Sequence, residues 1–396
     1  MALEATFHSY AIAGVLRPFV RRVVLSNPLQ TQALAQAKIK PDKVDARVLS
    51  QLLRCDYLPE VWQPDEATHR LRRLTHRRAP LVAERTRLKN RLHSVLAGER
   101  IVLPCDDLFS QKGLVWLRSV EMDPLDRQQI ESDLRLMEAT EKELQALEQT
   151  LARPAWEDER VKLLMTLPGV DYAVAQALLA ALGEISRFAD GEHAASYLGL
   201  VPSTHQSGEP CYHGPIPRHG NGKARRRLIQ AAPHVAAHPG PLGVFFRRLL
   251  KKKNRNVAVV ATARKLVVIA WQMRTHNEPY RYAQPQPTKT KRARLRVRVS
   301  GQKRASGTKK GEARSARYGT GESVRRIPAL PEVLDGEELP PTQPLNPAEE
   351  RMRAAMQVAE YVRSLGTPSQ RPRRSGTRSS RAEAEPSEPA PTHSVT

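Results

Sequence analysis

Residues 163–182 read LLMTLPGVDYAVAQALLAAL, two apolar segments on either side of a Pro-Gly pair. The spacing of the apolar residues predicts two helices, and Gly169 permits a tight turn between them. Helix–hairpin–helix elements have this form, and in them the second helix presents its backbone N–H groups to a phosphate. Plain helical corners share the same Pro-Gly signal. The stretch therefore predicts a helical hairpin and leaves open whether Gly169 contacts nucleic acid.

The hairpin belongs to a mainly helical unit that we place at residues 159–283. This unit ends with an apolar helix at 257–273, whose Arg264 and Lys265 are candidate nucleic-acid contacts. Within the unit lies the polar stretch STHQSGEPCYHG (203–214), followed by GNGKARRR (220–227). A serine hydroxyl beside basic side chains can attack a phosphodiester, because cations stabilise the charge that builds up during transfer.

Ser207, beside Gly208, is therefore a candidate nucleophile. Four basic residues downstream are candidate phosphate contacts: Lys223, Arg225, Arg226 and Arg227. Ser-Gly pairs also occur in ordinary loops, so these residues alone leave both interpretations open.

The segment 1–66 alternates short strand patterns with helical ones, which favours an α/β unit with a parallel or mixed sheet. Asp42 and Asp45 stand three residues apart at a predicted helix start, hence on one face of its first turn. Glu4 ends the first predicted strand and adds a third carboxylate. Oxygen ligands of this kind suit Mg²⁺ in phosphodiester chemistry. Acids at a helix start are also favoured by the helix dipole alone, so both interpretations stand.

Residues 67–158 are predicted to form long helices. Apolar residues recur at spacings of three, four or seven between 127 and 153, with Glu and Gln between them. This pattern is typical of a coiled-coil arm, and equally of a helix packed on its own domain. After residue 283 the composition shifts to Pro, Arg, Lys, Ser, Gly and Glu, which predicts a mostly disordered tail over 284–396. Within it, 347–365 could form an isolated amphipathic helix, and 288–298 is a basic run with sequence-blind affinity for nucleic acid.

Charge and cysteine content narrow the class of protein. The chain has 64 Lys and Arg against 41 Asp and Glu, a formal net charge of +23, which favours a polyanionic partner. Its 3 cysteines are too few for a disulfide framework. We expect an intracellular protein without a signal peptide or a membrane-spanning segment.

Taken in order, these stretches resemble the insertion sequence one-ten transposases, which include the Piv-type DNA invertases. The resemblance covers about residues 1–283 and rests on LEAT (3–6), SNP (26–28), AKIKPDKVDAR (37–47), LPEVW (58–62), ERTRLKNRLHSVL (84–96), LPGVDYAVAQALLAALGEISRF (167–188), ASYLGLVPSTHQSGE (195–209), HGNGKARRRLIQAA (219–232) and ARKLVVIAWQM (263–273).

The resemblance implies a RuvC-like, RNase H-type domain with an Asp-Glu-Asp-Asp metal site at 1–66. It further implies a coiled-coil arm at 67–158 and a transposase domain with a serine nucleophile at 159–283. Matched by motif, Glu4, Asp42 and Asp45 would hold Mg²⁺ and Ser207 would attack DNA, with Ser203 as the alternative serine.

The resemblance also implies site-specific DNA recombination, in some family members guided by a structured bridge RNA from the element itself. A homo-oligomer, dimer or tetramer, would bring the two domains together from different subunits, with the arm as its contact. The implied location is the bacterial cytoplasm, in association with the nucleoid.

The chain departs from the family at its beginning. The first aspartate of such proteins lies on a strand well before the Glu-Ala-Thr motif, whereas Met1 here stands three residues before Glu4. Phe7 stands where a glycine commonly follows that motif. We therefore expect an incomplete RuvC-like domain and impaired strand exchange by the chain as given. Two other functions remain open: a non-catalytic DNA- or RNA-binding remnant, and a metal nuclease that acts on Holliday junctions.

Overall fold

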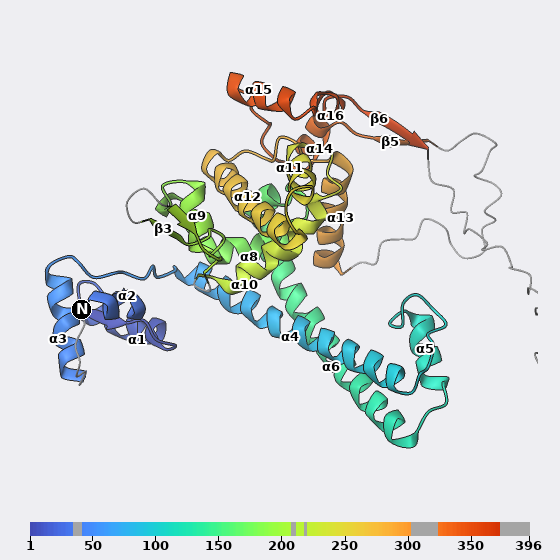
Figure 1. The fold of residues 1–396 in the computed structure, drawn as a ribbon, viewed down its shortest axis with the longest axis horizontal. Helices are drawn as coiled ribbons and strands as arrows, with labels where there is room; N and C mark the ends of the chain where they lie inside the picture. The colour runs from blue at the N-terminus through green and yellow to red at the C-terminus, as the bar shows by residue number, and fades with distance from the viewer. Residues whose placement is uncertain (35–41, 207–210, 218–219, 302–323, 373–396) are drawn as a thin grey trace, which may run out of the picture.

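The computed structural model describes residues 1–34, 42–206, 211–217, 220–301 and 324–372, and Figure 1 shows their arrangement. A helical core carries an arm of two long helices, a small N-terminal module with one strand pair, and a C-terminal layer of helices. The chain is thus mostly helical, as predicted for residues 67–283.

The predicted hairpin is present as α7 (Glu159–Leu164) and α8 (Tyr172–Leu182). The carboxylate of Asp171 accepts a hydrogen bond from the Val174 N–H and so begins α8. Eight residues of α8 are buried, because the helix is apolar on nearly every face and other helices surround it. Burial of α8 therefore organises the core.

The helices that surround α8 come from distant parts of the chain, between residues 66 and 231. The N-terminal part of α4 (Glu66–Gly98), α6 (Pro124–Glu157) and α10 (Gly222–Ala231) pack directly on it. A second layer follows from α12 (Arg255–His276), which packs on α7, α9 (Gly191–Tyr197), α10 and α11 (Pro241–Leu250). The shorter helical turns of this region are Ile185–Arg187 and Ala232–Val235.

The arm is a helical hairpin in which α4 and α6 run antiparallel (Figure 1). Its apolar stripe is covered within the chain, since the buried residues of α6 face α4 and the core. At the far end α5 (Gln111–Ser119) closes a separate apolar cluster of Leu92, Leu96, Leu108, Leu117, Ile130 and Leu134. The helices project as an arm and pack against their own chain, and the coiled coil stays a prediction.

The N-terminal module pairs β1 (Ala2–Glu4) with β2 (Val24–Ser26) in parallel. Around this pair lie α1 (Ser9–Leu16), the turn Arg17–Phe19, α2 (Pro28–Leu34) and α3 (Asp42–Arg54). The predicted alternation of strands and helices is present, with one pair of strands in the described part of 1–66. This arrangement does not by itself establish a RuvC-like fold.

Trp62 joins the module to the core. Its ring contacts two guanidinium groups, with the Arg72 Cζ at 4.8 Å and the Arg187 Cζ at 4.2 Å from the ring centroid. The ring edge also covers Gly183, where an added Cβ would lie 2.2 Å from the indole. Gly183 ends α8 with φ +61°, a conformation that side-chain-bearing residues rarely adopt.

The predicted disorder after residue 283 is wrong for the described residues of this segment. They form α13 (Pro285–Ser300), α14 (Leu330–Gly336), α15 (Pro347–Ala355), α16 (Ala359–Leu365) and the antiparallel strands β5 (Val324–Ile327) and β6 (Ser369–Pro372). The predicted helix over 347–365 is divided at Gln357, where φ is 55°. Residues 302–323 and 373–396 lie outside the described residues.

Tertiary pairing explains this difference. Arg292 of α13 is buried, its guanidinium bonds the Glu337 carboxylate at 3.0 Å, and it stacks 4.5 Å from the ring of Trp156. Composition alone counts such an arginine as solvated, whereas a distant carboxylate and an aromatic ring make its burial possible. The described helices contain no segment long and apolar enough to cross a membrane.

We predict that Gly183→Ala destabilises the protein by about 2 kcal/mol, since the new methyl group meets Trp62 and the backbone conformation disfavours alanine. Urea denaturation measures the change. Gly98→Ala is the matched control, because a Cβ there meets nothing within 4 Å and φ is ordinary. Equal stability of the two variants would contradict the role given to Gly183.

His238 gives the fold a pH dependence. Its ring is buried, and its Nδ1 accepts the Gly240 N–H at 3.0 Å. Burial lowers the pKa of His238 to about 4, with Arg247 and Lys291 adding repulsion. In the unfolded chain the ring takes up a proton at an ordinary pKa near 6.5, so this contribution to stability is present above that pH and is lost towards pH 4.

The expected loss is about 3 kcal/mol between pH ~6.5 and ~4. Denaturation of His238→Asn should show a correspondingly flatter pH profile than the unmodified chain. The same substitution at His276, whose side chain is exposed, should leave the profile unchanged. A His238→Asn profile that matches the unmodified chain would refute this assignment.

Candidate nucleic-acid interface and catalytic residues

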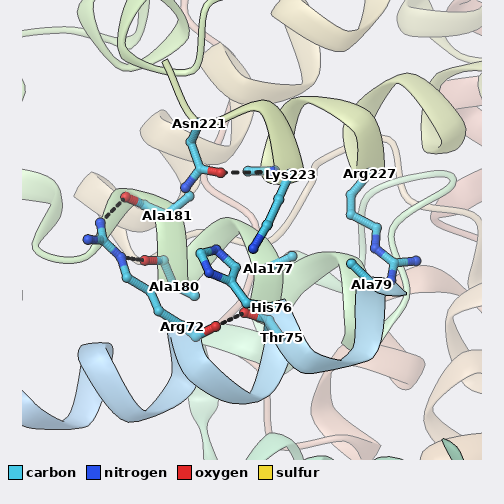
Figure 2. A pocket seen from close by; sticks show the side chains of 11 residues that line it. Arg72, Thr75, His76, Ala79, Ala177, Ala180, Ala181, Asn221, Lys223 and Arg227 are labelled. Carbon is cyan, nitrogen blue, oxygen red and sulfur yellow. Dashed lines mark hydrogen bonds between the residues drawn. The ribbon is translucent and has the colours of Figure 1, made fainter. Parts of the chain in front are cut away.

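A basic cleft lies where α4 and α10 cross α8 (Figure 2). Helix α10 begins at Asn221, whose side-chain oxygen accepts the Ala224 N–H at 3.1 Å. Its apolar face buries Ala224, Leu228 and Ala231, which leaves its basic residues on the other sides. The small side chains of Ala177, Ala180 and Ala181 on α8 form the floor of the cleft.

Four basic or titratable side chains line the cleft: Arg72 and His76 from α4, and Lys223 and Arg227 from α10. Arg72 is engaged with the protein, because its Nε bonds the Ala180 carbonyl at 2.6 Å and a terminal nitrogen bonds the Ala181 carbonyl at 3.0 Å. Figure 2 shows Lys223 reaching from α10 towards His76.

The pKa of His76 is lowered by burial and, further, by the positive charges of Lys223 and Arg72. Burial and the neighbouring Arg78 likewise lower the pKa of Arg227. Aspartate and glutamate are absent from the described lining of the cleft. Positive charge concentrated in such a lining, with Asp171 as a carboxylate near Arg227, favours a bound anion such as a phosphate.

The basic residues of α10 have two different roles: some can contact a ligand, and one holds the protein fold. Lys223 and Arg226 are exposed, and Arg227 lines the cleft. Arg225 instead donates to the carbonyls of Gly199 and Pro217, at 3.1 and 3.0 Å, and so fixes the segment before α10. Consecutive helical residues point in different directions, which a run of arginines in a sequence does not reveal.

A β-ribbon precedes α10. Strands β3 (Thr204–Gln206) and β4 (Cys211–His213) pair antiparallel, and residues 207–210 connect them. Ser207 falls in this connection and lies outside the described residues. Ser203, the alternative serine, stands at the base of the ribbon, where its Oγ donates to the Pro215 carbonyl at 3.3 Å. An added Cβ at Gly214 would lie 2.3 Å from this hydroxyl, so Ser203 is closely packed.

The acidic candidates lie in the N-terminal module. Glu4 is exposed at the end of β1, and α3, which packs against β1, carries half-buried Asp45 in its first turn. Asp42 begins α3, and its side chain lies outside the described structure. Neither Glu4 nor Asp45 has a salt bridge to a described residue.

Carboxylates on two packed elements, without a salt bridge to the described residues, fit a hard divalent cation, which takes oxygen ligands. Among the side chains that the structure describes, no three His, Cys, Asp or Glu lie close enough together to bind a metal. The Mg²⁺ site therefore stays a prediction.

Three further residues were predicted to contact nucleic acid: Gly169, Arg264 and Lys265. The first two contact other parts of the protein, and the third is exposed. Gly169 has φ +75°, and a Cβ there would lie 2.4 Å from the Ala231 carbonyl, so the turn packs tightly against the end of α10. Arg264 pairs with Glu192 through two nitrogens, at 2.8 and 2.6 Å. Lys265 is exposed on α12.

Sequence reasoning missed Arg72 and His76, which were assigned to the arm. A signal was present, since RLRRLTHRR at 70–78 is unusually basic for a helix start. What the sequence could not supply was the proximity of α10, which lies about 150 residues later and reaches α4 across α8.

Comparison with known proteins gives two family matches. Residues 161–243 match the model described as the transposase IS116/IS110/IS902 family, and residues 1–100 match a transposase model named for the DEDD transposases of IS110. These two ranges contain the ribbon, α10 and the acidic candidates.

Individual relatives agree with these matches. The transposase for insertion sequence element IS1111A of Coxiella burnetii is 30% identical over 138 residues, which are 34% of this chain and 38% of that protein. The pilin gene-inverting protein of Moraxella bovis is 28% identical over 270 residues, 65% of this chain and 74% of that protein. The transposase for insertion sequence element IS1328 of Yersinia enterocolitica is 22% identical over 286 residues, 69% of this chain and 83% of that protein.

We predict that Lys223→Gln weakens binding to duplex DNA by about fivefold and reduces the slope of affinity against salt by about one, because one phosphate contact is lost. Fluorescence anisotropy over a salt series measures both. The same change should raise the pKa of His76, visible in an NMR titration. Lys112→Gln, at the far end of the arm, is the control; an equal loss of affinity there would show that only net charge matters.

Proposed function

The chain belongs to the IS116/IS110/IS902 family of transposases, and from this we propose that it is a recombinase that cuts and rejoins the DNA of an insertion sequence. The observation that carries the proposal is that both matched parts occur in one chain, the acidic module before the helical unit with the ribbon. The basic cleft between α4 and α10 supports DNA as the partner.

Ser207 is proposed as the nucleophile. Its Oγ would attack a scissile phosphorus, forming a serine–phosphate bond while the bond to one DNA oxygen breaks, and that oxygen would leave as a hydroxyl after taking a proton. Lys223, Arg226 and Arg227 would hold the DNA backbone and offset negative charge during transfer. The covalent link would conserve the energy of the broken bond for rejoining.

Glu4, Asp42 and Asp45 are proposed to hold Mg²⁺, which when bound would polarise the scissile phosphate. These residues belong to the N-terminal module, which Figure 1 shows on the same side of the core as the β3–β4 ribbon. A composite centre from the two parts is therefore proposed, completed by a second subunit through the arm. A structured guide RNA is proposed as the second nucleic acid, bound by the same excess of positive charge.

The test compares three variants in a DNA cleavage assay that traps covalent adducts. Ser207→Ala should abolish the protein–DNA adduct, and Asp42→Ala should reduce its formation by at least about a hundredfold in the presence of Mg²⁺. Ser203→Ala is the matched control and should keep adduct formation, because its hydroxyl bonds the Pro215 carbonyl.

The outcomes distinguish the competing functions. An adduct that persists in Ser207→Ala removes the nucleophile assignment. Cleavage that needs Asp42 and not Ser207 would instead indicate a metal-dependent nuclease. If the unmodified chain binds DNA but neither cleaves it nor forms an adduct with Mg²⁺ present, the chain is a nucleic-acid-binding protein without catalysis.

A further inference from the structure

Lys291 of α13 reaches into the turn between α7 and α8. Its ammonium donates to three backbone carbonyls of that turn: Met165, Leu167 at 2.7 Å and Val170 at 3.0 Å. All three residues of the turn are buried, with at most 1% of their surface exposed. The carbonyls therefore converge on one point that water reaches poorly.

The charge of this ammonium has no direct counterion. Lys291 forms no salt bridge with a residue of the described structure, and Asp171 acts on it only through space. Burial lowers the pKa of Lys291 to about 7. An ammonium without a counterion is costly to bury, so the carbonyl dipoles must replace its hydration.

A ring of carbonyl oxygens is also how proteins bind desolvated monovalent cations, which lose their water to the same dipoles. K⁺ and the ammonium ion carry one charge each and are similar in size. A solvent-open groove of about 820 Å³, lined by Met165, Asp171 and α13, leads to the turn. An ion could thus enter if the lysine were shortened.

We propose that the turn Met165–Val170 is a monovalent-cation site whose cation is supplied by the chain itself, as the ammonium of Lys291. The helix α13 lies outside both family-matched ranges, so a segment beyond them sets the conformation of the hairpin. The inference is independent of DNA recombination, since it concerns the folding of the turn.

The test is chemical rescue in the full chain. Lys291→Ala removes the ammonium and opens the site, and should lower the thermal midpoint by about 5 °C in tetramethylammonium chloride, whose cation is too large to enter. Potassium or ammonium chloride at matched ionic strength should restore at least half of that loss. If the variant does not fold in tetramethylammonium, the yield of refolding in each salt replaces the midpoint as the readout.

Two controls isolate the site. Lys291→Met keeps the alkyl stem in the turn, so it should be destabilised without a response to K⁺. Lys289→Ala, on an exposed position of the same helix, should resemble the unmodified chain in all three salts. Equal midpoints of Lys291→Ala in the three salts, or no refolding in any of them, would overturn the proposal.

Discussion

The structure depends on the burial of one apolar helix, α8, whose C-terminal carbonyls have no partner within the helix. Four consecutive carbonyls, from Ala180 to Gly183, receive N–H groups of three arginines. Arg72 comes from α4, Arg187 from the turn after α8, and Arg274 from α12. A buried helix end needs such partners, and the negative end of the helix dipole favours cations there.

This arrangement positions the rest of the molecule. Arg72 and Arg187 also contact the ring of Trp62, so the same arginines that bond the carbonyls of α8 attach the N-terminal module. Arg72 at the same time forms one end of the basic cleft, with His76 beside it and α10 opposite. The acidic candidates and the basic cleft are therefore both placed relative to α8. In a composite catalytic centre, the C-terminal end of α8 would therefore determine how the acidic and basic residues lie relative to one another.

Positive charge serves two purposes in this chain. Some arginines and lysines hold the fold: Arg225 fixes the segment before α10, Arg292 pairs with Glu337, and Lys291 fills the hairpin turn. Others, such as Lys223 and Arg226, remain exposed and available to a polyanion. The net charge of +23 therefore overstates the number of groups free to contact nucleic acid. Substitution experiments need this distinction, because a buried arginine changes stability as well as binding.

The sequence by itself determined the hairpin, the long helices of the arm, the strand–helix alternation at the N-terminus and the resemblance to the IS110 transposases. These follow from local periodicity, turn residues and the order of motifs, which the chain carries without reference to distant partners. Tertiary structure alone decided which basic residues are engaged, that Arg72 and His76 face Lys223, and that residues 285–300 form a packed helix. The physical reason is the same in each case: a charged side chain becomes buried only when a carbonyl, carboxylate or aromatic ring from elsewhere in the chain replaces its water.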